Sequence, residues 1–202
     1  MDKSQFDLEH QNSNLESKIV ASLERISQAF KVLLWNESKE NSLSPIQVQV
    51  LIFLLYHSPE KRKVSYLANE FNLTKATISD TVKTLENKKL IKKEYEEEDA
   101  RSYLIQLTVE GRKIAEKTSL FAKNIQSPID ELTELEKENL LNNLFNIIQD
   151  LNKKGIITIQ RMCTTCEFHR LKNNKHHCQL LNIELLQKEL RIDCPEHILI
   201  EE

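Results

Sequence analysis

The sequence is short of glycine and has no long apolar run. Its 202 residues include only two glycines, Gly111 and Gly155. A phosphate-binding loop needs several glycines to bring backbone amides close to an anion, so this scarcity argues against a nucleotide site of that kind. Nowhere do about 18 uncharged apolar residues follow one another, and the N-terminal stretch MDKSQFDLEHQNSN is polar where a secretory signal is apolar. We therefore expect a cytoplasmic protein without a membrane span.

Groupings of catalytic residues are also missing. The sequence contains no paired carboxylates and no Ser/His/Asp arrangement, so we do not expect an enzyme. Cysteine is scarce as well, and four cysteines in a cytoplasmic protein are more often metal ligands or redox-active thiols than structural disulfides. With 40% hydrophobic and 29% charged residues, the chain has the composition of one folded domain plus a small module.

Two long amphipathic helices are predicted, one toward each end of residues 1–155. The first has apolar residues at steps of four, three, four and three, which places them on one stripe: Ile19, Leu23, Ile26, Phe30 and Leu33. The second begins with a capping box of Thr133 and Glu136 and is closed by Gly155. Its apolar stripe consists of Leu140, Leu141, Leu144, Ile147, Ile148 and Leu151.

These stripes predict an association surface. Beside a small core they leave apolar area that one chain does not cover easily, so we favour a homodimer over an intramolecular bundle. Between the two helices, Ser44, Pro45 and Gln47 provide an N-cap, a first-turn proline and a capping-box partner for the strongly apolar stretch VQVLIFLLYH. That third helix is expected to lie in the core.

A helix-turn-helix is predicted in the middle of the chain. A short helix over residues 65–71 is followed by a turn at 72–73, and Thr74 then caps a second helix. The residues that recur at helical spacing, and therefore face inward, are Ile78, Val82 and Leu85. The outer face carries the candidate DNA-contacting residues, which are Thr74, Lys75, Ala76, Thr77, Ser79, Asp80 and Lys83. Small, polar and partly basic side chains of this kind fit the major groove of DNA.

A hairpin, or wing, follows the second helix. Alternating residues predict strands over residues 91–95 and 102–107, joined by an acidic, turn-rich tip. Arg101 lies two residues after Asp99 at the base of the hairpin, where its guanidinium could reach a narrow minor groove while the carboxylate orients it. Both residues therefore join the candidate DNA-contacting set. The expected fold class is mainly α with a small β-wing, in which long dimerisation helices flank a winged helix-turn-helix.

Charge is unevenly distributed along the chain. Residues 61–113 contain 12 Lys or Arg and nine Asp or Glu, which gives a net charge of +3 within a chain of net charge −3. A positive region in a negative protein fits contact with DNA phosphates. A solvated surface of mixed charge would give a similar count, so the prediction of DNA binding rests on the motif.

Three stretches of the sequence carry a family resemblance. They are LSPIQVQVLIFL as the opening core helix, VSYLANEFNLTKATISDTVKTLENKKLI as the helix-turn-helix, and DARSYLIQLTVEGRKI as the wing with the helix after it. Five residues follow the order D-x-R and then L-T-x-x-G: Asp99, Arg101, Leu107, Thr108 and Gly111. On these residues the chain resembles the MarR family of bacterial winged-helix transcription regulators, over roughly residues 15–153.

The resemblance implies a mode of action. In such proteins the outer helices form a homodimer, the recognition helices read two half-sites of a near-palindromic operator, and the wings touch the flanking minor groove. A small-molecule effector often binds between the dimer helices and the winged domain. We therefore expect a DNA-binding transcriptional regulator whose partner is double-stranded DNA. The alternative is a metal or redox sensor, or a protein-interaction module, whose winged helix no longer binds DNA, and the acidic wing tip keeps that alternative open.

The last part of the chain contains a four-cysteine motif. Cys163, Cys166, Cys178 and Cys194 follow the spacing C-x2-C-x11-C-x15-C. Four thiolates are the full ligand set of a closed tetrahedral site, and a bound metal would stabilise a segment of about 40 residues that has little core of its own. We expect zinc, which is redox-inert. An iron–sulfur cluster accepts the same ligands, and Pro195 after the last cysteine is typical of ferredoxin-like clusters.

Other interpretations of the cysteine segment remain. Four histidines are candidates to replace a thiolate: His169, His176, His177 and His197. The CTTC pair could instead act as a dithiol switch, and a thiol oxidoreductase is the third hypothesis, although no βαβ context for that chemistry is evident. We expect a winged-helix and dimerisation domain over residues 1–156 and a cysteine-rich module over residues 157–202, in which the apolar residues of LLNIELLQKELRI recur at helical spacing.

Overall fold

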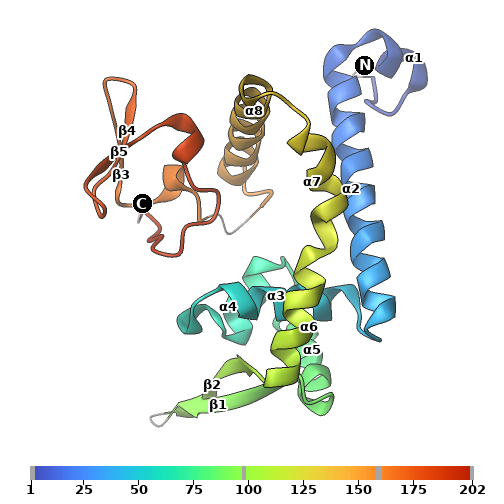
Figure 1. Cartoon of the computed structure of the whole chain (residues 1–202), viewed down its shortest axis with the longest axis vertical. Helices are drawn as coiled ribbons and strands as arrows, with labels where there is room; N and C mark the ends of the chain where they lie inside the picture. The colour runs from blue at the N-terminus through green and yellow to red at the C-terminus, as the bar shows by residue number, and fades with distance from the viewer. Residues whose placement is uncertain (1–2, 97–98, 158–160, 201–202) are drawn as a thin grey trace.

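The computed structural model describes residues 3–96, 99–157 and 161–200, and of residues 96 and 99–101 it describes the backbone only. The chain is mainly helical, with two small antiparallel sheets in this described part (Figure 1). Its α-helices are α1 (Leu8–Ser13), α2 (Leu15–Glu40), α3 (Pro45–Tyr56), α4 (Val64–Glu70), α5 (Lys75–Asn87), α6 (Val109–Thr118), α7 (Lys123–Asp130) and α8 (Glu134–Lys153). The strands are β1 (Ile91–Glu96), β2 (Asp99–Leu107), β3 (His169–Lys172), β4 (Lys175–Cys178) and β5 (Ile183–Leu185). Short 3-10 turns are η1 (Pro59–Lys61), η2 (Ser119–Ala122), η3 (Cys163–Thr165) and η4 (Gln187–Glu189).

The capping boxes predicted for α3 and α8 are confirmed. At the start of α3 the side chain of Ser44 accepts the backbone N–H of Gln47, and the Gln47 side chain accepts the N–H of Ser44. Thr133 and Glu136 form the same pair of hydrogen bonds at the start of α8. Each pair satisfies two backbone donors that have no partner inside the helix, which fixes where the helix begins.

The long first helix extends beyond its predicted stripe. α2 begins one turn earlier than Ile19 because the side chain of Asn14 accepts the backbone N–H of Ser17 at 2.8 Å. At its C-terminal end α8 is closed as predicted by Gly155, which has a φ of 68° and donates its N–H to the carbonyl of Asn152. A left-handed residue just after a helix satisfies the last carbonyls and turns the chain away.

The main core forms around α3. Side chains with no exposed surface come from α3, α4, α5 and β2 and include Leu51, Leu54, Leu67, Ile78, Val82, Leu85 and Ile105. The inward face predicted for α5 is thereby confirmed. Burying a Leu, Ile or Val side chain fully stabilises the fold by about 1.5 to 3 kcal/mol relative to exposing it, so these contacts hold the helix-turn-helix on α3.

The wing is an antiparallel hairpin fixed at its base. β1 and β2 pair from Ile91 with Leu107 outward, and the register shifts next to the tip. The N–H of Ile105 donates to the carbonyl of Arg62 at 2.9 Å, and the Arg62 guanidinium donates to Oε1 of Gln106. The segment before α4 therefore holds β2 at its edge, so the hairpin projects from the core in a fixed direction (Figure 1).

The junction between the wing and α6 depends on one glycine. Thr108 caps α6 by accepting the N–H of Gly111 at 3.0 Å, and its hydroxyl donates to the carbonyl of Lys89. A Cβ atom at position 111 would lie 1.8 Å from the carbonyl oxygen of Leu90. This close approach of two backbones gives the physical reason for the L-T-x-x-G order noted in the sequence.

Apolar side chains remain exposed along the two long helices. η2 lies beside α2, where the rings of Phe30 and Phe121 meet edge to face with centroids 6.3 Å apart. Figure 1 shows α7 continuing from η2. Elsewhere on α2 the exposed fractions of Ile26 and Trp35 are 47% and 55%. On α8, Ile147 is 39% exposed. A single chain therefore leaves part of both predicted stripes uncovered.

The C-terminal segment folds around a three-stranded antiparallel sheet of order β3-β4-β5. Asn173 and Asn174 join β3 to β4 with φ values of 50° and 60°, the two left-handed residues that a tight hairpin turn requires. The apolar spacing of residues 180–192 is typical of a helix, and the helix that it predicts is wrong. Ile183 and Leu185 alternate along β5 instead, and only the 3-10 turn η4 follows, because Asn182 turns back at a φ of 53° to pair β5 with β4.

This segment packs on α8 through a second, smaller core. The core contains Phe145 of α8 together with Met162, Cys163 and Leu190. Since α8 contributes a buried side chain to the cysteine segment, the division of the chain after residue 156 stays a prediction. Among the described residues no helix is both long enough and apolar enough to cross a membrane.

Candidate nucleic-acid interface and four-cysteine site

The recognition helix is positioned by a tight turn and a side-chain cap. Asn72 adopts a φ of 51° and the N–H of Leu73 donates to the carbonyl of Ala68 at 2.9 Å, which ends α4. Thr74 then caps α5 as predicted, because its hydroxyl oxygen accepts the N–H of Thr77 at 3.1 Å. The two helices are therefore joined by a short, hydrogen-bonded connection of the helix-turn-helix type.

The predicted contact residues of α5 share one solvent-exposed face. The exposed residues are Thr74, Lys75, Ala76, Thr77, Ser79, Asp80 and Lys83. Within the described part of the chain neither Lys75 nor Lys83 forms an ion pair with an acidic side chain, so both ammonium groups face solvent on a low surface of small residues. Such a surface can approach a nucleic-acid groove closely and place two positive charges beside phosphates.

One charged pair links the recognition helix to the wing. Nζ of Lys93 in β1 donates to Oε2 of Glu86 in α5 at 2.6 Å and lies 5.2 Å from the ring centroid of Tyr103. The hydrogen bond to Glu86 is the main cause that raises the pKa of Lys93, against a smaller opposing effect of burial. This pair connects α5 to the first strand of the hairpin. The prediction that Asp99 and Arg101 lie at the base of the hairpin is wrong, because β2 begins at Asp99, whose backbone pairs with Glu96 at the tip end. The side chains of Asp99 and Arg101 lie outside the described residues.

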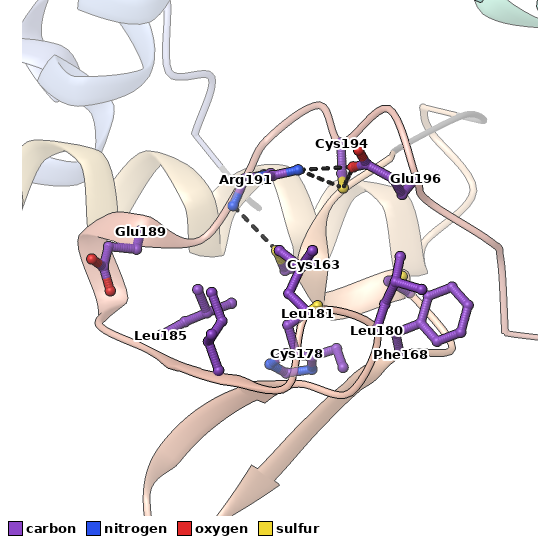
Figure 2. Close-up of a pocket in the computed structure, with 13 residues that line it drawn as sticks. Cys163, Phe168, Cys178, Leu180, Leu181, Leu185, Glu189, Arg191, Cys194 and Glu196 are labelled. Atoms are coloured by element: carbon purple, nitrogen blue, oxygen red, sulfur yellow. Dashed lines mark hydrogen bonds and ion pairs between the residues drawn. The ribbon is translucent and has the colours of Figure 1, made fainter.

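The four cysteines line a single cavity of about 200 Å³ (Figure 2). Cys163 begins η3 and Cys166 follows it, Cys178 ends β4, and Cys194 lies in the loop after η4. All four thiols are free. Elements that are distant in sequence therefore bring together the four cysteines that the spacing predicts as one ligand set. Apolar walls complete the cavity: Phe168, Leu180, Leu181, Ile183 and Leu185.

Arg191 donates hydrogen bonds to two of the sulfur atoms. Its backbone N–H lies 3.2 Å from Sγ of Cys163, and its Nη1 lies 3.4 Å from Sγ of Cys194 (Figure 2). Burial raises the pKa of the Cys163 thiol, and the N–H of Arg191 opposes that effect. Arg191 Nη1 also pairs with Glu196 at 2.9 Å, which holds the guanidinium at the cavity rim. These donors offset negative charge on the sulfurs when the thiols are deprotonated.

The candidate metal ligands around the cavity include the four thiols and one histidine. Among the described residues, no three His, Cys, Asp or Glu side chains are grouped closely enough to hold one metal ion. Of the histidines considered as ligands, His169 lines the cavity, but its ring nitrogen pairs with His176 at 2.8 Å. The ring of His197 pairs with the Thr165 hydroxyl at 2.9 Å. His169, His176 and His197 thus have polar partners of their own, and whether zinc binds the cysteines stays a prediction.

A buried arginine joins the cysteine segment to the helix-turn-helix. Arg161, two residues before Cys163, is 7% exposed. Its guanidinium donates to Asp193 at 2.5 and 2.8 Å and to Glu70 in α4 at 2.6 and 3.2 Å. Nη1 also lies 3.1 Å from the hydroxyl oxygen of Tyr66. Two carboxylates from opposite sides thereby share one cation.

The charges in this network reinforce one another. The guanidinium of Arg161 is the main cause that lowers the pKa of Asp193 well below its ordinary value, with His57 as a further hydrogen-bond donor 3.0 Å away. Burial opposes the charged form of Arg161, but the hydrogen bonds that its guanidinium donates to Asp193 and Glu70 outweigh this effect and raise the pKa of Arg161. Both groups are therefore charged across the physiological range. No sequence pattern pointed to Arg161, because a single arginine before a cysteine pair has no periodicity or spacing that identifies its partners.

A helix-turn-helix followed by a two-stranded hairpin defines a winged-helix protein, and the comparisons with known proteins show which proteins the chain is similar to. Residues 41–102 match the model of the MarR family. The chain is 27% identical to Staphylococcus aureus MepR in a MepR–DNA complex, with a TM-score of 0.57 over 65% of this chain and 97% of that chain. A second structure of MepR, a transcription regulator of the multidrug efflux pump MepA, is 26% identical to this chain. Its TM-score is 0.51 over 64% of this chain and 95% of that chain. YusO from Bacillus subtilis is 25% identical to this chain, with a TM-score of 0.50 over 67% of this chain and 95% of YusO.

Over residues 41–102 the chain therefore matches the model of the MarR family, and over about two thirds of its length it is similar to the solved structure of MepR with DNA. A comparison with curated proteins gives no match. The solved structures cover about two thirds of this chain and nearly all of their own length, so a third of the chain has no counterpart in them.

Proposed function

We propose that the protein is a DNA-binding transcriptional regulator that acts as a homodimer on a near-palindromic operator. The observation that carries the proposal is the exposed outer face of α5, where every predicted contact residue reaches solvent and none is used by the core. The similarity to MepR, one structure of which is a DNA complex, supports the same conclusion.

The residues of α5 divide into two kinds of contact. Lys75 and Lys83 neutralise backbone phosphates, which gives affinity and dependence on salt but little sequence preference. Thr77 and Ser79 are short hydroxyl side chains that reach base edges once the helix enters the groove. Arg101 is proposed to enter the flanking minor groove from the wing, with Asp99 orienting it.

The exposed apolar residues of α2 and α8 support the homodimer. Two copies that bury these faces against each other remove apolar surface from water, at about 25 cal/mol per Å². A two-fold axis between the copies then places the two α5 helices in successive major grooves, about 34 Å apart. The small-molecule effector implied by the family resemblance remains a prediction.

Salt dependence of DNA binding tests the proposal. A duplex selected from a randomised library is titrated with the protein, and fluorescence anisotropy is measured between 50 and 200 mM salt, a range over which phosphate contacts change affinity by about a hundredfold or more. Lys83→Ala is expected to weaken binding by about three- to tenfold and to reduce the slope of log affinity against log salt by about one. Lys153→Ala, at an exposed lysine on α8, is the matched control and should leave both unchanged. Absence of DNA binding at low salt contradicts the proposal.

That negative result would favour the alternative function, a sensor whose winged helix has lost its DNA contacts. The acidic wing tip, EEED at residues 96–99, is the sequence feature that favours this alternative, because it repels phosphates. Under either function the four-cysteine cavity is a structural or sensory site.

A further inference from the structure

The size and lining of the four-cysteine cavity indicate what kind of group it takes. A zinc ion with Zn–S bonds of about 2.3 Å in a tetrahedron holds its sulfur ligands only about 3.8 Å apart. In the described ranges no three His, Cys, Asp or Glu side chains are grouped so that they could hold one metal ion, although all four cysteines line the same cavity of about 200 Å³. The four cysteines thus line a space larger than a single ion needs, and Figure 2 labels Cys163, Cys178 and Cys194 around it.

An iron–sulfur cluster meets this arrangement. In a four-iron cluster each cysteine binds its own iron atom, so the four thiolates surround a group of several atoms and do not touch one another. Apolar side chains such as Phe168 and Leu181 line the remaining wall, which keeps water away from the bridging sulfides. The two donors of Arg191 point at the sulfur atoms of Cys163 and Cys194. Hydrogen bonds to ligand sulfurs adjust the reduction potential of iron–sulfur clusters.

We propose that Cys163, Cys166, Cys178 and Cys194 bind one four-iron, four-sulfide cluster, and that the presence of this cluster sets the DNA affinity of the winged helix. The regulatory half of the proposal rests on the DNA-binding function proposed above.

The route from the cavity to the winged helix is short and made of direct contacts. The N–H of Cys194 donates to the carbonyl of Arg161 at 2.9 Å, so two ligand-bearing segments are hydrogen-bonded to each other beside the cavity. From there the Arg161 guanidinium reaches Glu70 and Tyr66 on α4, the helix that precedes the recognition helix. Nζ of Lys61, next to α4, also donates to the carbonyl of Pro195 at 3.2 Å.

Loss of the cluster is expected to break the contacts that Arg161 makes between the cysteine segment and α4. Residues 161–166 and 193–194 have few buried apolar side chains of their own, apart from Met162, and bound metal is what closes small segments of this kind. When the ligand segments separate, Asp193 no longer supports Arg161 against Glu70, and α4 loses a fixed contact. The angle at which α4 presents α5 then changes, and with it the affinity for DNA.

Metal analysis of the full-length protein purified without oxygen tests the first half. About four iron atoms and four sulfides per chain, with a broad visible absorption, are expected, and Cys178→Ser should lose the absorption. Leu171→Ser, at an exposed residue of β3 that does not line the cavity, is the matched control and should keep it. One zinc per chain, or metal-free protein with four reduced thiols, overturns the cluster assignment.

DNA affinity of three samples tests the second half: cluster-loaded protein, protein stripped with an iron chelator, and cluster-loaded Arg161→Ala. The loaded and stripped proteins should differ by at least about fivefold, and the loaded variant should show the affinity of the stripped protein with its iron content unchanged. Glu70→Gln keeps the size of the side chain and should shift affinity in the same direction if Arg161→Ala does not fold. Equal affinities overturn the regulation. Failure of every sample to bind DNA overturns the proposed function and leaves the iron result standing.

Discussion

The guanidinium of Arg161 and the carboxylate of Glu70 form a two-point ion pair, with Nη1–Oε2 and Nη2–Oε1 distances of 2.6 and 3.2 Å. The pair joins positions 91 residues apart in sequence, and its side chains are 8% and 17% exposed. Fork-to-fork geometry of this kind fixes orientation as well as distance. It therefore defines how the cysteine segment lies against α4.

Removing this arginine should destabilise the folded chain. Arg161→Ala leaves the Glu70 carboxylate buried without its cation, and the free energy of unfolding is expected to fall by about 2 to 4 kcal/mol. Arg161→Lys should recover only part of the loss because an ammonium group cannot pair with two carboxylates in the same fork geometry. Denaturant unfolding measures both, and a double-mutant cycle with Glu70→Gln isolates the pair. Lys154→Ala, which breaks the exposed pair with Asp150, is the control and should cost about 0.5 kcal/mol or less.

Arg101 in the wing is expected to contribute to DNA affinity. Arg101→Ala should weaken binding to a selected operator by about tenfold and reduce the salt slope by about one, because one guanidinium no longer lies in the minor groove. Gel-shift titration measures the change. Arg170→Ala, on β3 of the C-terminal sheet, should leave affinity unaltered. An unchanged affinity for Arg101→Ala would show that the wing assignment is wrong.

A charge on the apolar face of α2 should separate the proposed dimer. Ile26 is 47% exposed in the single chain, and Ile26→Asp is expected to raise the dimer dissociation constant by at least about tenfold, since a buried unpaired carboxylate is costly. Analytical ultracentrifugation over a concentration series measures the constant. Gln28→Asp adds the same charge to the opposite face of the helix and should leave the dimer intact. Monomeric wild-type protein at every concentration would refute the homodimer.

The two glycines should respond very differently to the same substitution. Gly111→Ala places a Cβ 1.8 Å from the Leu90 carbonyl oxygen, so the wing and α6 must separate, at a cost of about 3 kcal/mol or more. At Gly155 no atom lies within 4 Å of the added carbon, and only the φ of 68° is unfavourable, which costs about 1 kcal/mol. Thermal unfolding of the two variants compares them directly. Similar melting temperatures would contradict the close approach at Gly111.

Much of the fold was predictable because its signals are local. Ser44 and Thr133 cap their helices through residues three positions away, and Ile78 and Leu85 are placed on one face by helical spacing alone. The outer face of α5 followed by elimination once its inner face was known. The four cysteines were also predictable as a group, because the residue type restricts their partners.

The features that were missed depend on contacts between distant segments. The partners of Arg161 lie 32 and 91 residues away, and nothing near Arg161 in the sequence indicates that it is buried. Residues 180–192 were assigned the wrong period because seven of these 13 residues are apolar, which suits a helix face and a strand equally well. Pairing with β4 decides between the two, and that pairing is set by tertiary structure.

The contact of Gly111 with Leu90 has a mechanical consequence. Because no side chain separates them, the backbones of the hairpin and α6 are in direct contact at their junction. α6 then continues through η2 into α7. We therefore expect the wing, α6, η2 and α7 to move together as one rigid body. In the proposed homodimer on DNA, a small tilt between the two copies would then displace the wing, and the recognition helix would not need to refold.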